Sequence, residues 1–467
     1  MPRPFHTFTV TEAGARIREG QLSAVQLVEA LLDRIDAVPQ VQAWVTVDRD
    51  EALATARQRD AEGRASRFRG PLHGVPVALK DIFHVAGMVT TAGAGPFAHE
   101  RATHDAAAVA RLRGAGAIIL GKVTTAEFAF FDPPDTRNPW NLEHTPGGSS
   151  SGPAAAVAAG MVPLALGSQT AGSTLRPAAY CGVVGLKPAH GRISCRGMVP
   201  LTWQFDHVGI FCRSVADAAV ALDVLAGYDP ADPFSRSDPP AGYSAALHAD
   251  RPSRPRLGFV RRPLLDRTGP EVAAHLEVTA ERLADAGAII EDVDLPESVE
   301  GLYEAGLRVM QVAAATIHRE RFARHADQFG PKIRALIEAG LELSGVDYAA
   351  AEQHCRRFKT DAAPVLAGVD AVLMPVADSP APKGLSSTGD PSFCAPWSFT
   401  GPPAIALPSG FAADGLPLAV QLAATDERRL LTTAAWCEAV LGVSSMTDGL
   451  GPGGDAAHSE LGWGVSN

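Results

Sequence analysis

Two clusters of glycine and serine flank an apolar, alanine-rich segment between Gly147 and Pro188. The first cluster reads GGSSSG and the second reads GSQTAGS. Glycine lets backbone pass close to other groups and serine supplies hydroxyls, so both clusters suit loops that converge on one place. The stretch between them predicts a helix over Pro153 to Gly160 and a strand over Val162 to Gly167. This order of loop, helix, strand and loop favours a layered α/β fold.

The alternation of helix and strand recurs elsewhere in the chain. Asp105 to Gly114 has the pattern of a helix, and Ala117 to Leu120 follows it as a strand. Val75 to Leu79 is a short apolar run after a Gly-Val-Pro turn, which predicts a buried strand. Two later apolar runs predict core strands at Ala371 to Pro375 and Ala404 to Leu407. The whole pattern indicates the α/β class.

The composition excludes several classes of protein. The 467 residues carry a net charge of −11 and no run rich in Lys and Arg, which argues against a nucleic-acid-binding surface. There is no apolar stretch of about 18 residues and no secretory leader pattern, so we expect a soluble cytoplasmic protein that does not bind a membrane. Six scattered cysteines predict free thiols. HExxH, clustered His/Asp ligands and GK[ST] are absent, so we expect no metal and no cofactor.

A lysine stands at the end of one apolar run. Lys80 follows the predicted strand Val75 to Leu79, where its charge would lose solvation. Burial lowers the pKa of a lysine, so Lys80 could act as a base near neutral pH. The alternative is a surface lysine that pairs with its neighbour Asp81.

The two Gly/Ser clusters and the apolar run that ends at Lys80 together resemble the amidase signature family of serine hydrolases. The family pattern has a lysine after a GVPxxxKD run, a GGSS loop, and a serine at the end of a GTxTxGS loop. This chain has LHGVPVALKDIF, and its two loop serines, Ser149 and Ser173, are 173 − 149 = 24 residues apart, the family spacing. The segments VDAVLMPVADSPAP and GLPLAVQLAA also look like the family's usual ending, so the resemblance spans nearly the whole chain.

The resemblance implies a single amidase-signature domain over residues 1–467. Its α/β fold would have a large mixed, mostly parallel β-sheet covered by helices on both faces. The expected parts are a helical amino-terminal layer (1–66), a catalytic core (70–225), a loop and helical region on the substrate side (229–370), returning core strands with a helix (371–445), and a flexible tail (446–467).

The resemblance also assigns catalytic roles. Ser173 would be the nucleophile, and Lys80 the general base that reaches it through the hydroxyl of Ser149. The Gly148–Ser149 peptide would be cis. An oxyanion hole would be formed by the backbone N–H groups of Thr170, Ala171, Gly172 and Ser173. From the residues alone, Ser173 could instead cap the segment that follows it, and Ser149 could be the N-cap of the next helix.

Several residues around the nucleophile depart from the common family pattern. Gln169 stands where many members carry Asp, and Ser151 replaces a frequent glycine. Arg176 lies three residues after Ser173, whereas many members have an arginine two residues after it. We expect a supporting shell of Ser150, Gln169, Arg176 and Asp206, with a pairing between Arg176 and Asp206.

Three aromatic residues are candidates for the wall of a substrate pocket. Phe130 and Phe131 lie in the segment from Phe128 to Asn141, which is shorter than in many members of the family, and Trp397 lies far downstream. They predict an open entrance suited to aryl substrates. Packing in the protein core is the alternative for each of them.

The resemblance implies a cofactor-free amidohydrolase that forms an acyl-enzyme and cleaves the C–N bond of a small amide, aryl amide or carbamate. Hydrolysis of a urea derivative of the biuret or allophanate type is one alternative. Another is the glutaminase-type subunit of a tRNA-dependent amidotransferase, which commonly reads KDN where this chain has Lys80-Asp81-Ile82. A Ser-His-Asp triad is disfavoured because GxSxG surrounds neither Ser149 nor Ser173. The sequence leaves a monomer and a homodimer open.

Overall fold

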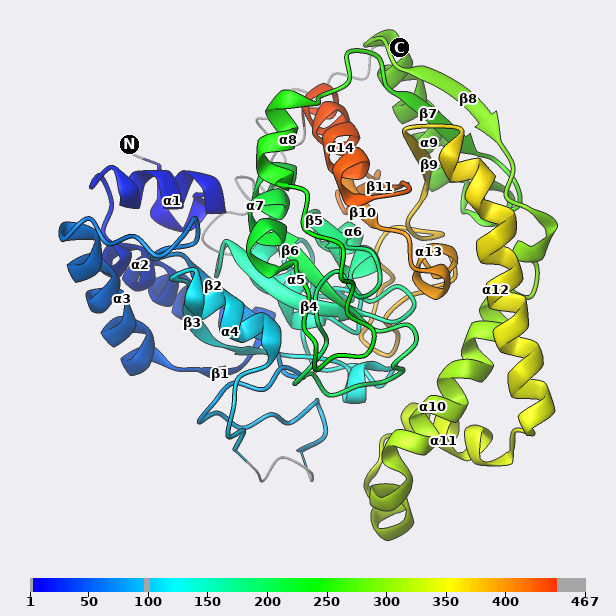
Figure 1. Cartoon of the computed structure of the whole chain (residues 1–467), viewed down its shortest axis with the longest axis horizontal. Coiled ribbons are helices and arrows are strands. Elements are labelled where there is room, and N and C mark those ends of the chain that lie inside the picture. The colour runs from blue at the N-terminus through cyan, green and yellow to red at the C-terminus, as the bar shows by residue number, and fades with distance from the viewer. Residues whose placement is uncertain (1–2, 96–100, 443–467) are drawn as a thin grey trace.

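The computed structural model describes residues 3–95 and 101–442, and these are arranged around one large sheet (Figure 1). Its eleven strands lie in the order β1-β3-β2-β4-β6-β5-β10-β11-β9-β7-β8. The strands are β1 Trp44–Val47, β2 Pro76–Lys80, β3 Ile118–Val123, β4 Leu164–Gln169, β5 Val184–Lys187, β6 His207–Cys212, β7 Arg256–Val260, β8 Ile289–Val293, β9 Ala371–Pro375, β10 Ala404–Phe411 and β11 Pro417–Ala423.

The sheet is mixed, and the predicted α/β class is confirmed. Parallel pairing occurs in two blocks, β3-β2-β4 and β9-β7-β8. Antiparallel pairs join the blocks through β6, β5, β10 and β11, and β1 adds an antiparallel edge. The expected predominance of parallel pairing therefore holds inside the blocks and not across the centre of the sheet.

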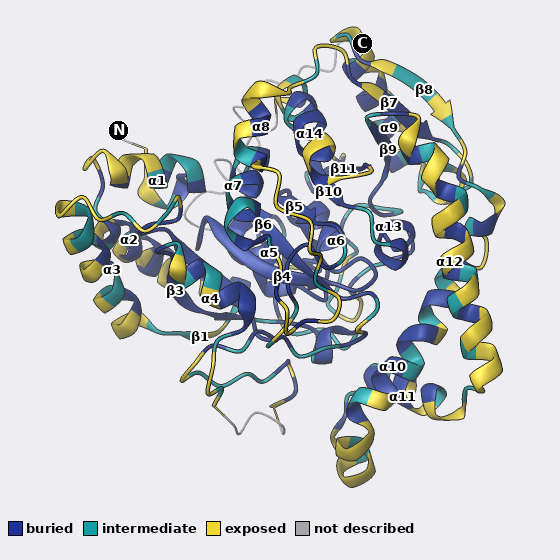
Figure 2. Cartoon of the chain, in the orientation of Figure 1, coloured by how far each residue is buried: buried dark blue, intermediate teal, exposed yellow. Residues whose placement is uncertain are grey.

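Helices cover both faces of the sheet, as expected. One face, with Val77 and Leu79, packs against α4 Ala107–Gly114, α7 Val215–Leu225, α8 Tyr243–Ala249, α9 Pro270–Asp285 and α14 Glu427–Leu441. The other face, with Ala78 and Val372, packs against α2 Ala24–Ala37, α3 Arg49–Arg64, α5 Ser151–Ala158, α6 Leu175–Cys181, α12 Gly345–Ala367 and α13 Ala395–Thr400. Neighbouring strand residues face opposite cores because side chains alternate along a strand. Figure 2 shows the central strands buried, β8 at the edge of the sheet partly exposed, and the outer sides of the helices exposed.

The local predictions were largely confirmed. Ser23 and Gln26 form the predicted capping box at the start of α2. The helix predicted over 153–160 is α5, and the next strand is β4. One prediction is wrong: the region 229–370 contains two strands, β7 and β8, besides its loops and helices. β8 was missed because it pairs only with β7, at the edge of the sheet, and has mostly half-exposed or exposed residues. The expected tail at 446–467 lies outside the described residues.

Three long helices form an arm beside the sheet: α10 Leu302–His325, α11 Pro331–Glu342 and α12 (Figure 1). The arm is fastened to the loop after β3. Glu127 accepts a hydrogen bond from the Gly330 N–H, and Asp132 accepts from the N–H groups of Lys332 and Ile333. α1 Val10–Arg18 packs on the opposite side of the molecule, near α2 and α7.

Candidate active site

Lys80 is the last residue of β2, and its side chain is completely buried. Its ammonium nitrogen lies 2.8 Å from the Ser149 hydroxyl oxygen and 2.8 Å from that of Ser168. Burial holds the pKa of Lys80 well below its usual value, and the negative charge of Asp206 opposes this shift only in part. A neutral amine in contact with two hydroxyls can accept a proton from either.

Asp81 does not pair with Lys80, so the interpretation of Lys80 as a surface lysine is excluded. The Asp81 carboxylate lies 2.5 Å from the Lys122 ammonium, and both side chains are fully buried. Asp81 also accepts hydrogen bonds from the backbone N–H and the hydroxyl of Thr91. Its two oxygens are therefore engaged away from Lys80.

The first Gly/Ser loop holds Ser149 against the lysine. The Gly148–Ser149 peptide is cis, as the resemblance implies. Ser149 is not the N-cap of α5, because that position is Ser150, which makes no capping hydrogen bond. The Ser150 hydroxyl instead donates to the Ser168 carbonyl oxygen at 3.1 Å and accepts from the Ser168 N–H at 3.2 Å. These two hydrogen bonds fix the loop to β4 at Ser168, the residue that also contacts Lys80.

Position 167 in β4 requires a glycine. A Cβ at this position would lie 2.7 Å from the Ser150 hydroxyl oxygen and 2.6 Å from the Phe211 ring. Only a residue without a side chain lets the two Gly/Ser loops approach this closely.

Ser168 was missed by the sequence analysis. Its hydroxyl accepts from Lys80, and its backbone binds Ser150. The available signal was its place in GSQTAGS, directly after the strand predicted over Val162 to Gly167.

The second loop runs from β4 into α6 and carries Ser173. Gln169 shapes it: its side-chain oxygen accepts from the N–H groups of Thr174 at 2.7 Å and Leu175 at 3.0 Å. The Gln169 amide nitrogen donates to the Ser398 hydroxyl, which donates in turn to the Ala171 carbonyl oxygen. Ser398 is a further supporting residue that the sequence analysis missed, because it lies more than two hundred residues away in the chain.

Ser173 does not cap the helix that follows it. The N-cap of α6 is Thr174, and within residues 3–95 and 101–442 the Ser173 hydroxyl has no hydrogen-bond partner. The side chain is nearly buried, at 8% exposure. The backbone N–H groups of Ala171, Gly172 and Ser173 likewise have no acceptor in this part of the chain. Three unpaired N–H groups in succession at one turn form a nest for an anion.

Asp206 supports the second loop and does not pair with Arg176. One Asp206 oxygen accepts from the Thr170 hydroxyl at 2.6 Å, and the other accepts from the N–H groups of Leu201 and Thr202. Burial raises the pKa of Asp206 to about 6. The predicted pairing was wrong because Arg176 points to the first loop. Its Nη2 donates to the Gly148 carbonyl oxygen at 2.6 Å and to the Thr388 hydroxyl at 3.2 Å.

The aromatic candidates separate into core and site residues. Trp397 is completely buried, packs near Phe358 and donates a hydrogen bond to the Met374 sulfur. It therefore belongs to the core and does not line a substrate pocket. Phe130 is nearly buried and packs edge-on against Phe131. Phe131 is half-buried, and its ring centre lies 5.9 Å from the Arg176 guanidinium carbon. Of the three, Phe131 contacts the site.

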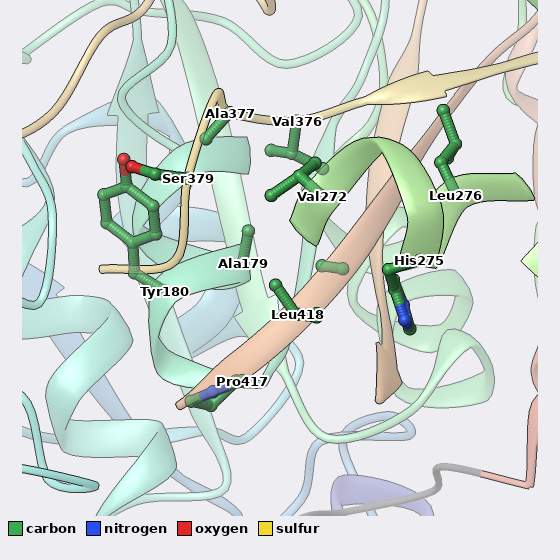
Figure 3. A pocket seen from close by; sticks show the side chains of 11 residues that line it. Ala179, Tyr180, Val272, His275, Leu276, Val376, Ala377, Ser379, Pro417 and Leu418 are labelled. Atoms are coloured by element: carbon green, nitrogen blue, oxygen red, sulfur yellow. The ribbon is translucent and has the colours of Figure 1, made fainter. Parts of the chain in front are cut away.

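Two cavities border other residues discussed above, one at Asp206 and one at Tyr180. The larger, about 300 Å³, reaches Asp206 and is lined by residues that include Cys195, Met198 and Trp203. That volume is enough for a small organic molecule. The smaller, about 20 Å³, lies behind α6 between Tyr180 and residues of α9 and β11 such as His275 and Leu418 (Figure 3). It has room for little more than a water molecule.

In the part of the chain that the structure describes, no three His, Cys, Asp or Glu side chains gather as a metal site would require. None of the described helices has the length and apolarity needed to cross a bilayer.

The comparisons with known proteins agree with this geometry. A model of the family "Amidase" matches residues 26–431. The chain belongs to the amidase family. It is an amidohydrolase that acts on C–N bonds.

Its relatives are named for different activities. The chain is 37% identical to a glutamyl-tRNA(Gln) amidotransferase subunit from Roseiflexus castenholzii, over 92% of this chain and 94% of the relative. A structure from work on the origins of an s-triazine catabolic enzyme matches with TM-score 0.86 at 28% identity, covering 94% of this chain and 99% of that one. Peptide amidase from Stenotrophomonas maltophilia matches with TM-score 0.80 at 32% identity, covering 93% and 97%.

Proposed function

We propose that this amidase cleaves a small-molecule amide through an acyl-enzyme on Ser173. The observation that carries the proposal is the buried Lys80, whose amine contacts the Ser149 hydroxyl at 2.8 Å and, among the residues that the structure describes, has no carboxylate in contact with it. Such a lysine is available as a base at neutral pH, which an exposed or ion-paired lysine is not.

The proton then moves in two short steps. Ser173 attacks the carbonyl carbon, its proton passes to the Ser149 oxygen, and the Ser149 proton passes to Lys80. The return of that proton through Ser149 lets the amine leave and the acyl-enzyme form. Water then attacks the acyl-enzyme by the same route, which releases the acid and restores Ser173.

The second loop would stabilise the oxyanion of each tetrahedral intermediate. The unpaired N–H groups of Ala171, Gly172 and Ser173 support this role. Thr170 is the fourth expected member, and its hydroxyl is held by Asp206. Because Gln169, Asp206 and Ser398 fix the loop before substrate arrives, little reorganisation is needed during reaction.

For the substrate, we propose a small amide, with aryl amides and carbamates as the bulkier members of its range. Phe131 supports an aryl contact, but Trp397 cannot contribute because it is buried in the core. The case for a large aromatic entrance is therefore weaker than the sequence predicts. The similarity to a structure tied to s-triazine catabolism favours urea derivatives as a second class to test.

A second candidate function is the glutaminase-type subunit of a tRNA-dependent amidotransferase. The 37% identity to such a subunit favours it. Glutaminase activity that depends on a co-purified second subunit would support this candidate. Turnover of simple amides by the isolated chain would support a free hydrolase.

The proposal is tested by covalent labelling. A fluorophosphonate should modify Ser173 and stop turnover of a panel of anilides, aliphatic amides, carbamates and biuret. The Ser173→Ala variant should take up no label, and EDTA should leave the rate unchanged. An adduct mapped by mass spectrometry to another residue, or strong inhibition by EDTA, would contradict the mechanism.

A further inference from the structure

The larger cavity, which reaches Asp206, is not used by the proposed reaction. Its volume is about 300 Å³, and none of the three proposed catalytic residues, Lys80, Ser149 and Ser173, lines it. An apolar cavity of about 150 Å³ is enough to bind benzene. By the same measure, this cavity has room for a molecule of about two fused rings.

Two aromatic side chains at this cavity are exposed to solvent. Trp203, between β5 and β6, is 43% exposed, and Phe234, after α7, is 41% exposed. Ile193, Met198 and Pro233 add further apolar surface to the lining. Large apolar side chains that gather at one hollow of the surface are typical of a binding site. A flat ring in the cavity would gain contact area with both aromatic side chains.

Two charged side chains of the cavity wall already have partners in the protein. Asp232 accepts from the Ser194 hydroxyl and from the Cys195 N–H, each at 2.9 Å. The Arg196 guanidinium donates to the Asp229 carboxylate at 2.8 Å. A charged ligand would have to compete with these interactions while losing its own hydration. The wall therefore favours a neutral molecule over an ion.

Asp206 connects the cavity to the second Gly/Ser loop. One of its oxygens accepts from the Thr170 hydroxyl at 2.6 Å, and the other accepts from the N–H groups of Leu201 at 2.8 Å and Thr202 at 3.0 Å. Trp203 is the next residue of that segment and lines the cavity. A ligand that orders Trp203 therefore also orders the backbone that holds Asp206 against Thr170.

His190 provides a second connection. Burial lowers the pKa of His190 to about 4, so its ring is neutral at neutral pH and suits an apolar ligand. The ring packs edge-on against His207, with ring centres 5.1 Å apart. Nδ1 of His207 lies 3.1 Å from the Gln169 carbonyl oxygen and 2.6 Å from that of Phe205, so this nitrogen carries the proton and donates to both. Gln169 in turn shapes the loop of Ser173.

We propose that this cavity binds a neutral, planar aromatic molecule of about two fused rings, and that its occupation changes turnover at the neighbouring site without displacing the substrate. The exposed aromatic pair and the paired charges of the wall define the class of ligand. Asp206 and His207 carry the effect to the second loop. The binding step is independent of the proposed acyl-enzyme mechanism.

Calorimetry with indole tests the binding step. Indole is neutral, has two fused rings and dissolves in water to millimolar concentrations. Titration of the wild-type protein should show one saturable site with a dissociation constant of about 0.1–1 mM. Indole-3-carboxylate, which adds a charge to the same rings, should bind at least about tenfold more weakly. Absence of saturable indole binding, or equal or tighter binding of the carboxylate, would overturn the proposal.

Variants at exposed positions locate the bound indole without disturbing the core. Ala231 is an exposed residue of the cavity wall, so Ala231→Trp should fill the cavity, and Trp203→Ala removes one of its rings. Both should weaken indole binding at least about tenfold. Tyr228→Ala is the matched control, because Tyr228 is 55% exposed and does not line the cavity, and it should keep the wild-type affinity. Unchanged affinity in Ala231→Trp would reject the site.

Steady-state kinetics test the effect on turnover. With an aliphatic amide, whose own shape does not suit the cavity, saturating indole should change kcat at least about twofold and leave KM within about twofold. Ala231→Trp should abolish this response. A rise in KM at constant kcat would mean that indole occupies the catalytic site, and an unchanged kcat would reject the coupling. Calorimetry requires no turnover, so it still decides the binding step if Ser173 proves not to be the nucleophile.

Discussion

Lys80 and Lys122 lie side by side on neighbouring parallel strands and have opposite surroundings. Leu79 of β2 is in register with Lys122 of β3, and both lysine side chains are fully buried. The Lys122 ammonium lies 2.5 Å from the Asp81 carboxylate. Lys80 contacts two hydroxyls, and Asp206 acts on it only by long-range electrostatic attraction. Burial lowers both pKa values, but Asp81 opposes the shift directly at Lys122. The counter-ion, and not burial, separates a structural lysine from a candidate base.

The largest expected effect is the loss of activity in Lys80→Met. This change removes the base and keeps the apolar stem, so kcat/KM should fall at least about 10⁴-fold, which corresponds to ~5 kcal/mol in the barrier. Thermal unfolding should occur at the wild-type temperature or higher, because the cost of burying the amine is gone. Steady-state kinetics and calorimetry check both. Near-normal turnover with the wild-type pH profile would make Lys80 structural.

Lys122→Met should reduce stability and largely keep activity, the opposite of Lys80→Met. It leaves the Asp81 carboxylate buried without its cation, so the free energy of unfolding should fall by about 3–5 kcal/mol. At a temperature where the variant stays folded, kcat/KM should remain far above that of Lys80→Met. Urea unfolding and kinetics on the same samples measure the two effects. A Lys122→Met variant that is stable but inactive would contradict the assignment of Lys122 as a structural lysine and Lys80 as the candidate base.

The pH dependence follows from the lowered pKa of Lys80. The base is neutral above this pKa, so kcat/KM should rise with pH through it and level off well below pH 10.5. At pH values between this lowered pKa and the usual value, Lys80 is protonated in the unfolded chain and neutral in the folded protein. The contribution of Lys80 to the free energy of unfolding therefore increases as pH rises. The stability advantage of Lys80→Met should therefore shrink toward pH 10.5. An advantage that grows with pH would contradict this sign.

The smallest expected effect is a shift of the pH–rate profile in Asp206→Asn. The Asp206 charge raises the pKa of Lys80, so its removal should move the rise in kcat/KM to lower pH. The amide can still accept from the N–H groups of Leu201 and Thr202. Profiles measured with one substrate for both proteins check the direction. A shift to higher pH would show that Asp206 does not act on Lys80 by its charge.

The sequence predicted local elements well and long-range pairs poorly. The capping box of Ser23 and Gln26 and the buried strand before Lys80 were confirmed, because both are set by residues close together in the chain. The pairing of Arg176 with Asp206 was wrong, because nothing local shows that Gly148 and Thr388 surround the guanidinium. Trp397 was misjudged for a similar reason, since an aromatic residue suits a pocket wall and a core equally.

By itself, the sequence identified Lys80, Ser149 and Ser173 as candidate site residues, since they stand in a pattern whose spacing is that of a known family. Tertiary structure alone decided their charges and partners. No carboxylate of the described residues contacts Lys80, and Lys122, from the next strand, engages Asp81. Asp206 does not pair with Arg176, because its carboxylate accepts from Thr170, Leu201 and Thr202. Protonation and hydrogen bonding depend on groups within a few ångströms in space, and those groups come from distant parts of the chain.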